Sequence, residues 1–167
     1  LSDMRLLFVI TMLLILAFSI RGNNLPDKFF GKFSLDHSDN FDAYLTAKGF
    51  NWIMRRIIML LNIDVVFSKA GEHSFNYDFL TILKDIHVKN IVLGKEMKAE
   101  TLNTRLSNVW VKVSIHLRGA RLYVKQGPVD PKDHDVEGIF SYKVDGDTLV
   151  LLLQAEGVVA KNYFKRQ

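Results

Sequence analysis

Five histidines and 18 carboxylate side chains are the residues of this chain that could carry acid–base or metal chemistry. The histidines are His37, His73, His87, His116 and His134. They are scattered along the chain and never stand at the spacing of metal ligands. The carboxylates are equally dispersed, and only the fold could bring two of them together as a catalytic pair. We therefore expect no catalytic residue and no metal site.

Other kinds of site also lack a sequence signal. The chain has no cysteine, which excludes a thiolate nucleophile, a disulfide framework and a cysteine metal site. It has neither the Gly-x-Ser-x-Gly motif of many serine hydrolases nor a glycine-rich phosphate loop. The formal net charge is only +4, and basic residues alternate with acidic ones instead of forming a stripe. We expect no cofactor and no nucleic-acid partner.

The beginning of the chain has the pattern of a secretory signal peptide. Arg5 precedes a mostly apolar run over residues 6–20, which is shorter than the ~20 residues needed to span a bilayer. We expect a cleaved leader over residues 1–22, in which residues 1–3 have no assigned role, and a mature domain over residues 23–167. The expected location is extracellular. A retained anchor and a lysosomal destination are the alternatives.

Two helices are expected near the start of the mature domain, after one strand over residues 29–35. Ser38 or Asp39 is expected to cap the first helix, because a short side-chain oxygen can accept from the free amides of the first turn. Gly49 is expected to end it in the left-handed conformation that glycine adopts readily. Asn51 is expected to cap the second helix.

From residue 63 onward the alternation of apolar and polar residues, with turn residues between, predicts only strands. The expected strands are 63–67, 74–80, 84–93, 108–117, 121–126, 139–144, 148–155 and 158–165. About ten antiparallel strands can close into a barrel and so remove their exposed edges. We predict an all-β fold, a ten-stranded antiparallel β-barrel capped by a helix-turn-helix lid, with room inside for one apolar ligand.

Several short motifs resemble one known family. They are Phe30-Gly31-Lys32-Phe33, Asn40-Phe41-Asp42-Ala43-Tyr44-Leu45, Leu93-Gly94-Lys95-Glu96-Met97 and Asn162-Tyr163-Phe164. With these motifs, the chain from about residue 25 to its end resembles the fatty acid-binding proteins. Two further segments, Leu25-Pro26-Asp27-Lys28-Phe29 and Trp52-Ile53-Met54-Arg55, resemble the secreted nematode branch of that family in particular. The resemblance implies a β-clam of two nearly orthogonal sheets with two helices over the ligand portal. It also implies a monomer that carries a long-chain fatty acid or a neutral derivative.

The resemblance also implies where a ligand head group would lie. Many members of the family hold a lipid carboxylate with two arginines and a tyrosine, and the corresponding positions here are Tyr142, Asn162 and Phe164. The charged anchor is therefore missing. Either the head group is neutral and held by Asn162 and Tyr142, or a carboxylate binds elsewhere, such as near Arg118, Arg121 or the portal. A register one position away would turn the side chains outward.

The expected lid carries two further sets of candidate residues. Those that could line the portal and cavity are Phe41, Leu45, Phe50, Met54 and Ile58. The alternative is that these side chains only dock the helices on the barrel, because an amphipathic helix must bury its apolar stripe.

A pair of neighbouring arginines in the second helix, Arg55 and Arg56, could make transient contact with an anionic membrane surface. The alternative is a solvated basic face.

Taken together, these features predict a secreted carrier that binds a fatty acid or a derivative reversibly inside a lidded barrel. The alternatives are a secreted enzyme that acts on lipids and a signalling carrier of neutral fatty acid derivatives that a partner receptor recognises.

Overall fold

Ten strands and two α-helices are found in the computed structural model, which describes residues 24–167. In chain order the elements are the 3-10 turn η1 (Asp27–Phe29), β1 (Gly31–Asp39), α2 (Phe41–Ala47), α3 (Trp52–Met59), β2 (Ile63–Lys69), β3 (Phe75–Thr81), β4 (Ile86–Ile91), β5 (Glu96–Leu102), β6 (Asn108–Arg118), β7 (Arg121–Pro128), the 3-10 segment η2 (Pro131–Val136), β8 (Gly138–Asp145), β9 (Thr148–Ala155) and β10 (Val158–Arg166). The predicted ten-stranded barrel with two short helices between its first two strands is confirmed. The expected leader over residues 1–22 lies outside the described residues. Between residues 24 and 167, no helix has the length and apolar character to cross a membrane.

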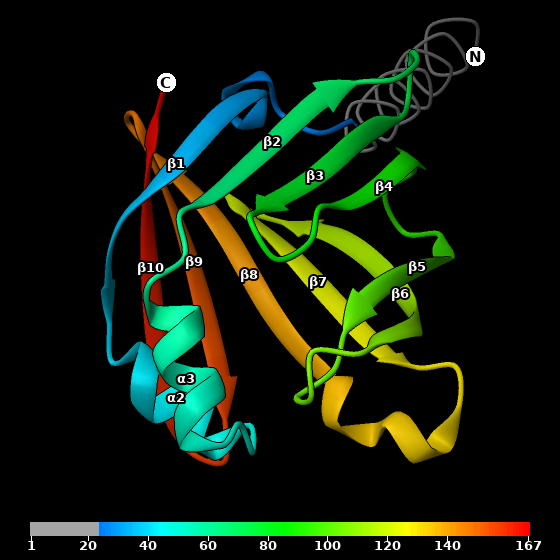
Figure 1. Cartoon of the computed structure of the whole chain (residues 1–167). Helices are drawn as coiled ribbons and strands as arrows, with labels where there is room; N and C mark the ends of the chain where they lie inside the picture. Colours follow the sequence, from blue (N-terminus) through cyan, green and yellow to red (C-terminus); the bar gives the residue numbers. More distant parts are fainter. Residues whose placement is uncertain (1–23) are drawn as a thin grey trace, which may run out of the picture.

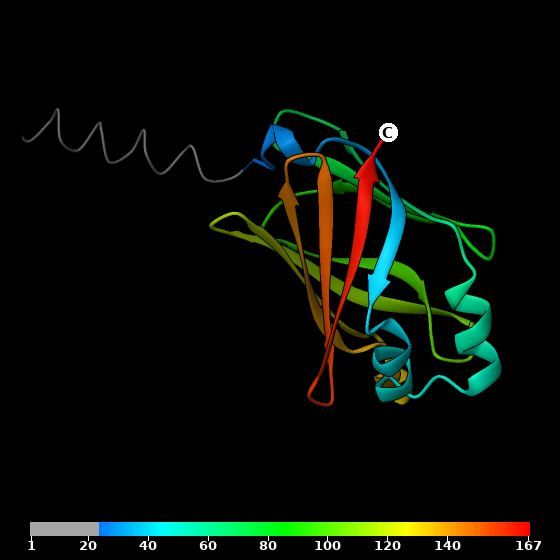
Figure 2. The ribbon, with the colours of Figure 1, turned by 90° about the vertical axis from the view of Figure 1, so that its left-hand side faces the viewer.

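The strands form one antiparallel sheet in the order β4-β3-β2-β1-β10-β9-β8-β7-β6-β5. The first and last strands are neighbours within it, with Phe33 opposite Arg166 and Asp39 opposite Lys161. The sheet curls round so that β4 and β5, which end the order, face each other (Figures 1 and 2). These two strands are not hydrogen-bonded neighbours. We call the line between them the seam.

Five buried phenylalanines fill the end of the barrel where η1 and the turn between β2 and β3 lie, which is the end away from the two helices in Figure 1. Each of these rings is at most 2% exposed, and together they form the aromatic plug, which consists of Phe29, Phe33, Phe67, Phe75 and Phe164. Fully burying one phenylalanine side chain contributes about 1.5–3 kcal/mol. The plug therefore stabilises the closed end and confines any internal space to the half of the barrel beneath the helices.

The two helices begin and end at residues that differ in part from those predicted. Ser38 and Asp39 belong to β1, so the expectation that one of them caps the first helix is wrong. The helix instead follows Asn40, which adopts the left-handed conformation (φ 58°) and donates from Nδ2 to the Val159 carbonyl at 2.8 Å. Ladder pairing with β10 holds residues 38 and 39 in the strand because it satisfies their backbone groups first. Gly49 does lie beyond the helix end at φ 90°, as predicted.

The second helix begins as predicted, because the Asn51 side chain accepts from the Met54 amide at 3.0 Å. Three features of the barrel differ from the prediction. β5 (Glu96–Leu102) was not expected as a strand of its own, and the connection after β7 contains η2. The first strand begins at Gly31, since residues 27–29 form η1, which turns Phe29 into the plug.

Candidate ligand-binding cavity

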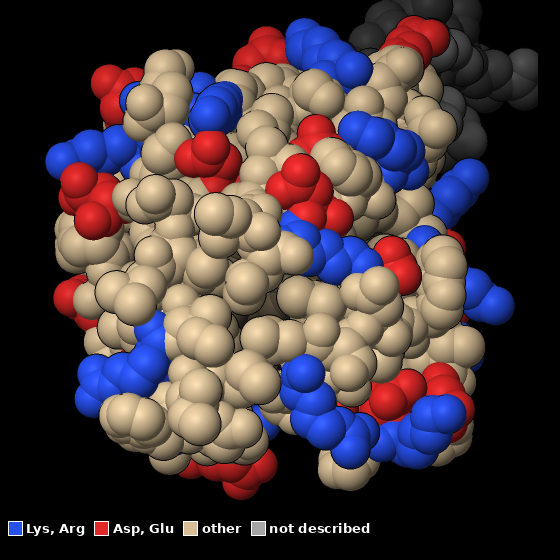
Figure 3. All heavy atoms as spheres, viewed as in Figure 1, with Lys and Arg blue, Asp and Glu red and all other residues tan. Residues whose placement is uncertain are grey.

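A cavity of about 310 Å³ lies between the two helices and the inner face of the barrel. Its walls are mainly aliphatic and aromatic, because the inward positions of the strands alternate with outward polar ones. Inward residues of β6 and β7, including Val111, Val113 and Val124, form one wall. Figure 3 shows a hollow near the centre of one face of the molecule, framed mostly by side chains that carry no charge. The size and lining are those of a site for one apolar ligand.

The inner end of the cavity, next to the aromatic plug, contains a pair of tyrosines. The hydroxyls of Tyr77 in β3 and Tyr142 in β8 are 2.7 Å apart, so one donates to the other. Desolvation raises the pKa of both phenols, and both are therefore neutral hydroxyls at physiological pH. The Phe67 ring of the plug lies edge-on to Tyr142, with 5.8 Å between ring centroids. The pair thus marks the boundary between the plug and the open part of the cavity.

Asn162 in β10 is a second polar residue on the cavity wall. Its side chain is 2% exposed, and its Oδ1 atom is buried with no hydrogen-bond partner among residues 24–167. The strand register places it in one row with Tyr142, since both residues pair with Leu151 of β9. Neighbouring strands are about 4.8 Å apart, so the two backbones are roughly 10 Å apart with Leu151 between them. Both side chains line the cavity.

The third residue predicted for the head group lies deeper. Phe164 is also inward and fully buried, but it belongs to the aromatic plug and is not among the residues that line the cavity. It pairs with Leu149, one row further toward the closed end than Asn162. The inward direction of all three predicted side chains rules out a register shift by one position. The head-group role itself stays a prediction for Tyr142 and Asn162, and the position of Phe164 does not favour it.

Four of the five lid residues proposed from the sequence line the cavity, namely Phe41, Leu45, Phe50 and Ile58. Met54 is not among the lining residues, although it is half-buried and lies one helical turn before Ile58 on α3. Leu45 is 3% exposed and is the one fully buried residue of α2, whereas α3 buries no residue fully. The docking face of the lid and the cavity lining are thus largely the same side chains, and the two interpretations of this face are compatible.

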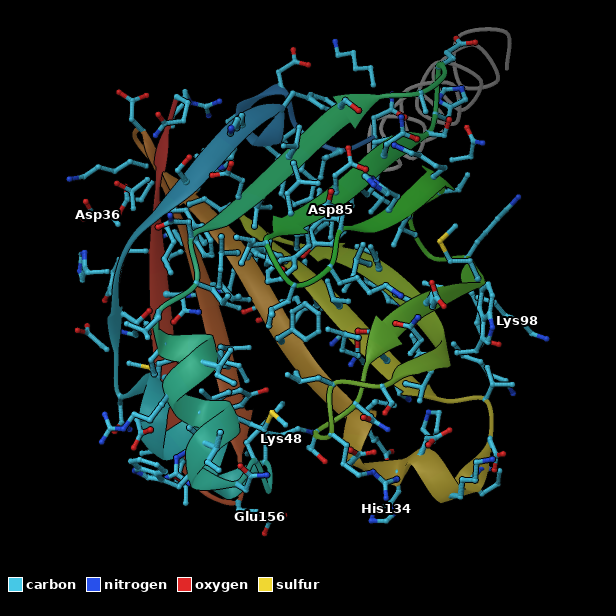
Figure 4. The ribbon with its side chains drawn as sticks, in the orientation of Figure 1. Asp36, Lys48, Asp85, Lys98, His134 and Glu156 are labelled. Carbon is cyan, nitrogen blue, oxygen red and sulfur yellow. The ribbon has the colours of Figure 1, made fainter. Side chains whose placement is uncertain are left out.

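The charged residues that line the cavity within the described part of the chain are Lys48, Lys84, Glu100, Asp135 and Glu137. Lys48, at the end of α2, donates to the backbone carbonyl of Glu137 at 2.8 Å and so reaches across the mouth (Figure 4). Burial lowers the pKa of Lys48, and the nearby carboxylates of Asp135 and Glu137 oppose that shift. Lys84 forms an ion pair with Glu100 at 2.9 Å.

Neither arginine proposed as an alternative anchor reaches the cavity. Arg118 and Arg121 are not among the lining residues, and they flank the turn between β6 and β7 at the outer ends of those strands. The Arg118 guanidinium lies over the outward Tyr123 ring at 5.9 Å. The proposal that a carboxylate binds near them is therefore not favoured by the geometry.

The two lid arginines have different surroundings. Arg55 donates from Nε to the Asp42 carboxylate at 3.0 Å and from Nη1 to the Phe50 carbonyl at 3.1 Å, and its side chain is only 18% exposed. These contacts join α3 to α2 and occupy the guanidinium, so Arg55 is poorly placed to contact a membrane. Arg56 is exposed, and its guanidinium lies 5.8 Å from the Trp52 ring. Membrane contact stays a prediction that now concerns Arg56.

Large apolar side chains surround Arg56 on the outside of the lid. Trp52 and Ile53 of α3 are 61% and 60% exposed, and Leu60, which follows the helix, is 85% exposed. Ile82, in the turn between β3 and β4, is 91% exposed. That turn follows Thr81, which pairs with Ile63 at the start of β2, a few residues beyond the end of α3. An exposed apolar patch of this extent is typical of an interaction surface.

Tyr77 and Lys48 are among the cavity residues that sequence reasoning missed. Tyr77 had a signal, because it alternates with Phe75 and Phe79 on the apolar face of its strand. Lys48 had none, since its contact partner is 89 residues away in the chain. Within residues 24–167 no group of three or more histidine, aspartate or glutamate side chains is placed to hold a metal ion.

Comparison with known proteins gives consistent results, although no family model matches the chain. "Fatty acid-binding protein homolog 1" of Caenorhabditis elegans is 35% identical over 158 residues, which cover 94% of this chain and 96% of that protein. The "Fatty acid-binding protein homolog" of Ascaris suum is 32% identical over 165 residues, which cover 97% and 98%.

Solved structures agree with these relatives. The structure titled "As-p18, an extracellular fatty acid binding protein" matches with a TM-score of 0.78 and 34% identity over 86% of this chain and 99% of that one. A Schistosoma mansoni fatty acid binding protein in complex with arachidonic acid matches with a TM-score of 0.68 and 25% identity, over 84% and 97% of the two chains.

Proposed function

This chain belongs to the fatty acid-binding protein family, and from that premise we propose that it carries a fatty acid or a fatty acid derivative, bound reversibly inside its barrel. The observation that supports this most is the apolar cavity of about 310 Å³ beneath the helices. Moving a hydrocarbon chain from water into such a space contributes about 0.8 kcal/mol per buried methylene. Burial of the chain therefore supplies most of the affinity.

Lipid binding is tested with protein that has first been stripped of lipid. The stripped protein, titrated with a fluorescent C18 fatty acid analogue, should bind one equivalent, and unlabelled C18 lipids should displace it. Leu122→Trp, at a fully buried position of the cavity wall, should reduce binding by filling the space. Failure of every C18 lipid to displace the probe would contradict the proposal.

Catalysis on lipids is the competing function, and a turnover assay separates the two. A carrier should release the same lipid that it bound, so an ester substrate incubated with the protein should be recovered intact. Hydrolysis that depends on one histidine or carboxylate of this chain would overturn the carrier proposal.

We also propose that the protein is secreted. The leader pattern over residues 1–22 supports this, as does the description of As-p18 as extracellular. Expression of the full chain in cultured cells, followed by N-terminal sequencing of protein from the medium, tests it. Retention of all the protein inside the cells would contradict secretion.

Delivery to membranes is a further part of the proposal, supported by the patch formed by Trp52, Ile53, Leu60 and Ile82 around Arg56. Apolar side chains beside a cation suit the boundary of an anionic bilayer. Lipid transfer to vesicles should accelerate with anionic lipid content and slow with added salt. Transfer rates that do not depend on vesicle concentration or charge would indicate release through water instead.

A further inference from the structure

The outward face of β5 to β8 carries a concentration of positive charge. Every lysine and arginine of these four strands occupies an outward position, since the alternate residues of the strands point into the barrel. Figure 4 shows one of them, Lys98, pointing away from the barrel. Together they form what we call the basic strip, which consists of Lys98, Lys112, Arg118, Arg121, Lys125 and Lys143.

Few carboxylates accompany the basic strip. β6 and β7, which supply four of its six cations, contain no aspartate or glutamate. On the outward faces of β5 and β8 the carboxylates are Glu96, Glu100 and Asp145, and Glu100 already pairs with Lys84. The face therefore has an excess of positive charge.

The cations of the strip are also unpaired, in contrast to those of β1 to β4. None of the six forms an ion pair with another described residue. Each of the three cations of β1 to β4 does so: Lys32 pairs with Asp64, Lys69 with Asp27 and Lys89 with Asp78. One half of the sheet thus neutralises its outward cations and the other half leaves them free.

The strand register places several cations of the strip directly opposite one another. Lys98 pairs with Lys112, and Arg118 pairs with Arg121, which in turn pairs with Lys143. Like charges at opposed positions of a sheet are destabilising. Local conflicts of this kind are expected where a surface serves function at the expense of stability.

The strip is elongated along the strands. Lys112 and Arg118 are six residues apart on β6, which is roughly 20 Å at the rise of a strand. Lys125 lies between these two levels, because it pairs with Ser114. The order of the chain hides the strip, since its members come from four strands and alternate with inward apolar residues.

We propose that the basic strip binds a linear sulfated polysaccharide, with the anionic groups of the chain lying along β6 and β7. Charge complementarity supports a polyanionic partner. A linear chain can follow the outside of the curled sheet, whereas a flat bilayer would meet this convex surface only along a line. The choice of a polysaccharide over a nucleic acid rests on the proposed secretion, which brings the protein to extracellular polysaccharides.

The apolar residues of the face also favour a polyanion over a membrane. The large exposed apolar residues of β5 to β8 are Trp110 and Ile139, near the starts of β6 and β8. The row of three cations lies at the opposite ends of those strands, where no large apolar side chain is exposed among the described residues. Interfacial membrane binding combines cations with buried apolar side chains.

The probe for the test is a heparin oligosaccharide, titrated into the purified protein in a calorimeter. Heparin should bind, and chemically desulfated heparin should bind about tenfold more weakly. Because binding of a polyanion releases counterions, the affinity should fall about 100-fold between 50 and 200 mM NaCl. Anionic vesicles and single-stranded DNA are titrated under the same conditions.

Two triple variants that remove the same net charge assign the effect to the strip. The first is Lys112→Gln, Arg118→Gln, Lys125→Gln, at three exposed positions, and its heparin affinity should be about tenfold lower. The second is Lys32→Gln, Lys69→Gln, Lys89→Gln, in the paired half of the sheet, and its affinity should change less than about twofold. The first should melt at no lower temperature than the wild-type protein, because it relieves repulsion between opposed cations.

A fluorescent C18 fatty acid analogue separates this inference from the carrier function. Both triple variants should bind it like the wild-type protein, because the substituted side chains do not line the cavity. A joint loss of heparin and lipid binding in the first variant would overturn the inference, since the loss would then come from the fold. Absence of heparin binding, or equal weakening in the two triple variants, would also overturn it. Tighter binding to the vesicles or to DNA than to heparin would overturn the choice of partner.

Discussion

Arg55 of α3 and Asp42 of α2 form an ion pair at 3.0 Å that joins the two helices of the lid. The same guanidinium also donates to the Phe50 carbonyl in the connection between the helices. Its neighbour Arg56 forms no ion pair within residues 24–167 and faces solvent beside Trp52. Two adjacent arginines thus have separable roles, the first in the structure of the lid and the second on its surface.

The first prediction uses this pair as its own control. Arg55→Gln should loosen the lid and increase the rate of ligand release about fivefold, because it removes an interaction of roughly 1 kcal/mol. Arg56→Gln should leave the release rate into buffer unchanged and slow only transfer to anionic vesicles. Stopped-flow fluorescence measures both rates. Equal effects of the two substitutions on release into buffer would contradict the assignment.

The second prediction concerns Arg166, which holds the closed end of the barrel. It donates to the carbonyls of Phe30 at 2.7 Å and Lys28 at 2.6 Å, and its guanidinium lies 4.4 Å from the Phe33 ring centroid. Arg166→Ala should lower the free energy of unfolding by about 2–4 kcal/mol. Arg166→Lys should recover little of it, because lysine lacks the planar fork.

Urea denaturation measures the change in stability at Arg166. Lys165→Ala is the matched control, since Lys165 is exposed and only pairs with the surface residue Asp36. It should change stability by less than about 1 kcal/mol. If Lys165→Ala lost as much stability as Arg166→Ala, the effect would belong to the end of β10 in general and not to the Arg166 contacts.

The third prediction is a dependence of stability on alkaline pH. Desolvation raises the pKa of Tyr77 and Tyr142 in the folded protein, whereas in the unfolded chain both ionise near pH 10. Above pH 10 the folded state therefore keeps protons that the unfolded state has lost. Stability should fall with rising pH by about 1.4 kcal/mol per pH unit for each tyrosine, until the folded pKa is reached.

Urea denaturation curves measured at several pH values between 8 and 11 test this dependence. The double variant Tyr77→Phe, Tyr142→Phe should show a flatter curve above pH 10, whereas Tyr123→Phe should keep the slope of the wild-type protein. A slope that the double variant leaves unchanged would place the titration on other groups.

The fourth prediction concerns chain length. Affinity in a series of saturated alcohols should rise about fourfold for each added methylene until the cavity is full, and then level off. Ala99→Leu enlarges a buried residue of the cavity wall on β5, so the plateau should move to a shorter chain. Ala70→Leu, at an exposed position, should leave the plateau where it is. Calorimetric titration gives both curves.

Local signals in the sequence were sufficient to predict most of the fold. The cap at Asn51 and the turn at Gly49 act within a few residues, and the alternation of β6 to β10 is regular. β5 gave a weaker signal, because Glu96, Lys98 and Glu100 alternate with inward residues as small as Ala99. It becomes a strand mainly through its full pairing with β6, which is a tertiary effect.

Predictions for the site were limited by depth within the barrel. Alternation showed that Asn162 and Phe164 point the same way, but it could not show that one lines the cavity and the other belongs to the plug. That difference depends on the filling of the barrel by Phe29 and Phe33, which come from the other end of the chain. Likewise, nothing local to Arg55 indicates its pairing with Asp42.

The seam between β4 and β5 is the place where the circumference of the barrel could increase without the loss of any backbone hydrogen bond between strands. Separating two paired strands breaks a ladder of backbone hydrogen bonds, but no such ladder joins these two. Near the mouth the seam is crossed by Lys84, which holds Glu100 of β5 and also bonds Asn108 of β6. Widening the barrel here would therefore break the contacts of Lys84 and some apolar packing, but no strand pairing. The described barrel is thus an incomplete cylinder, and at the end beneath the lid a side-chain contact between the β3–β4 turn and β5 spans its gap.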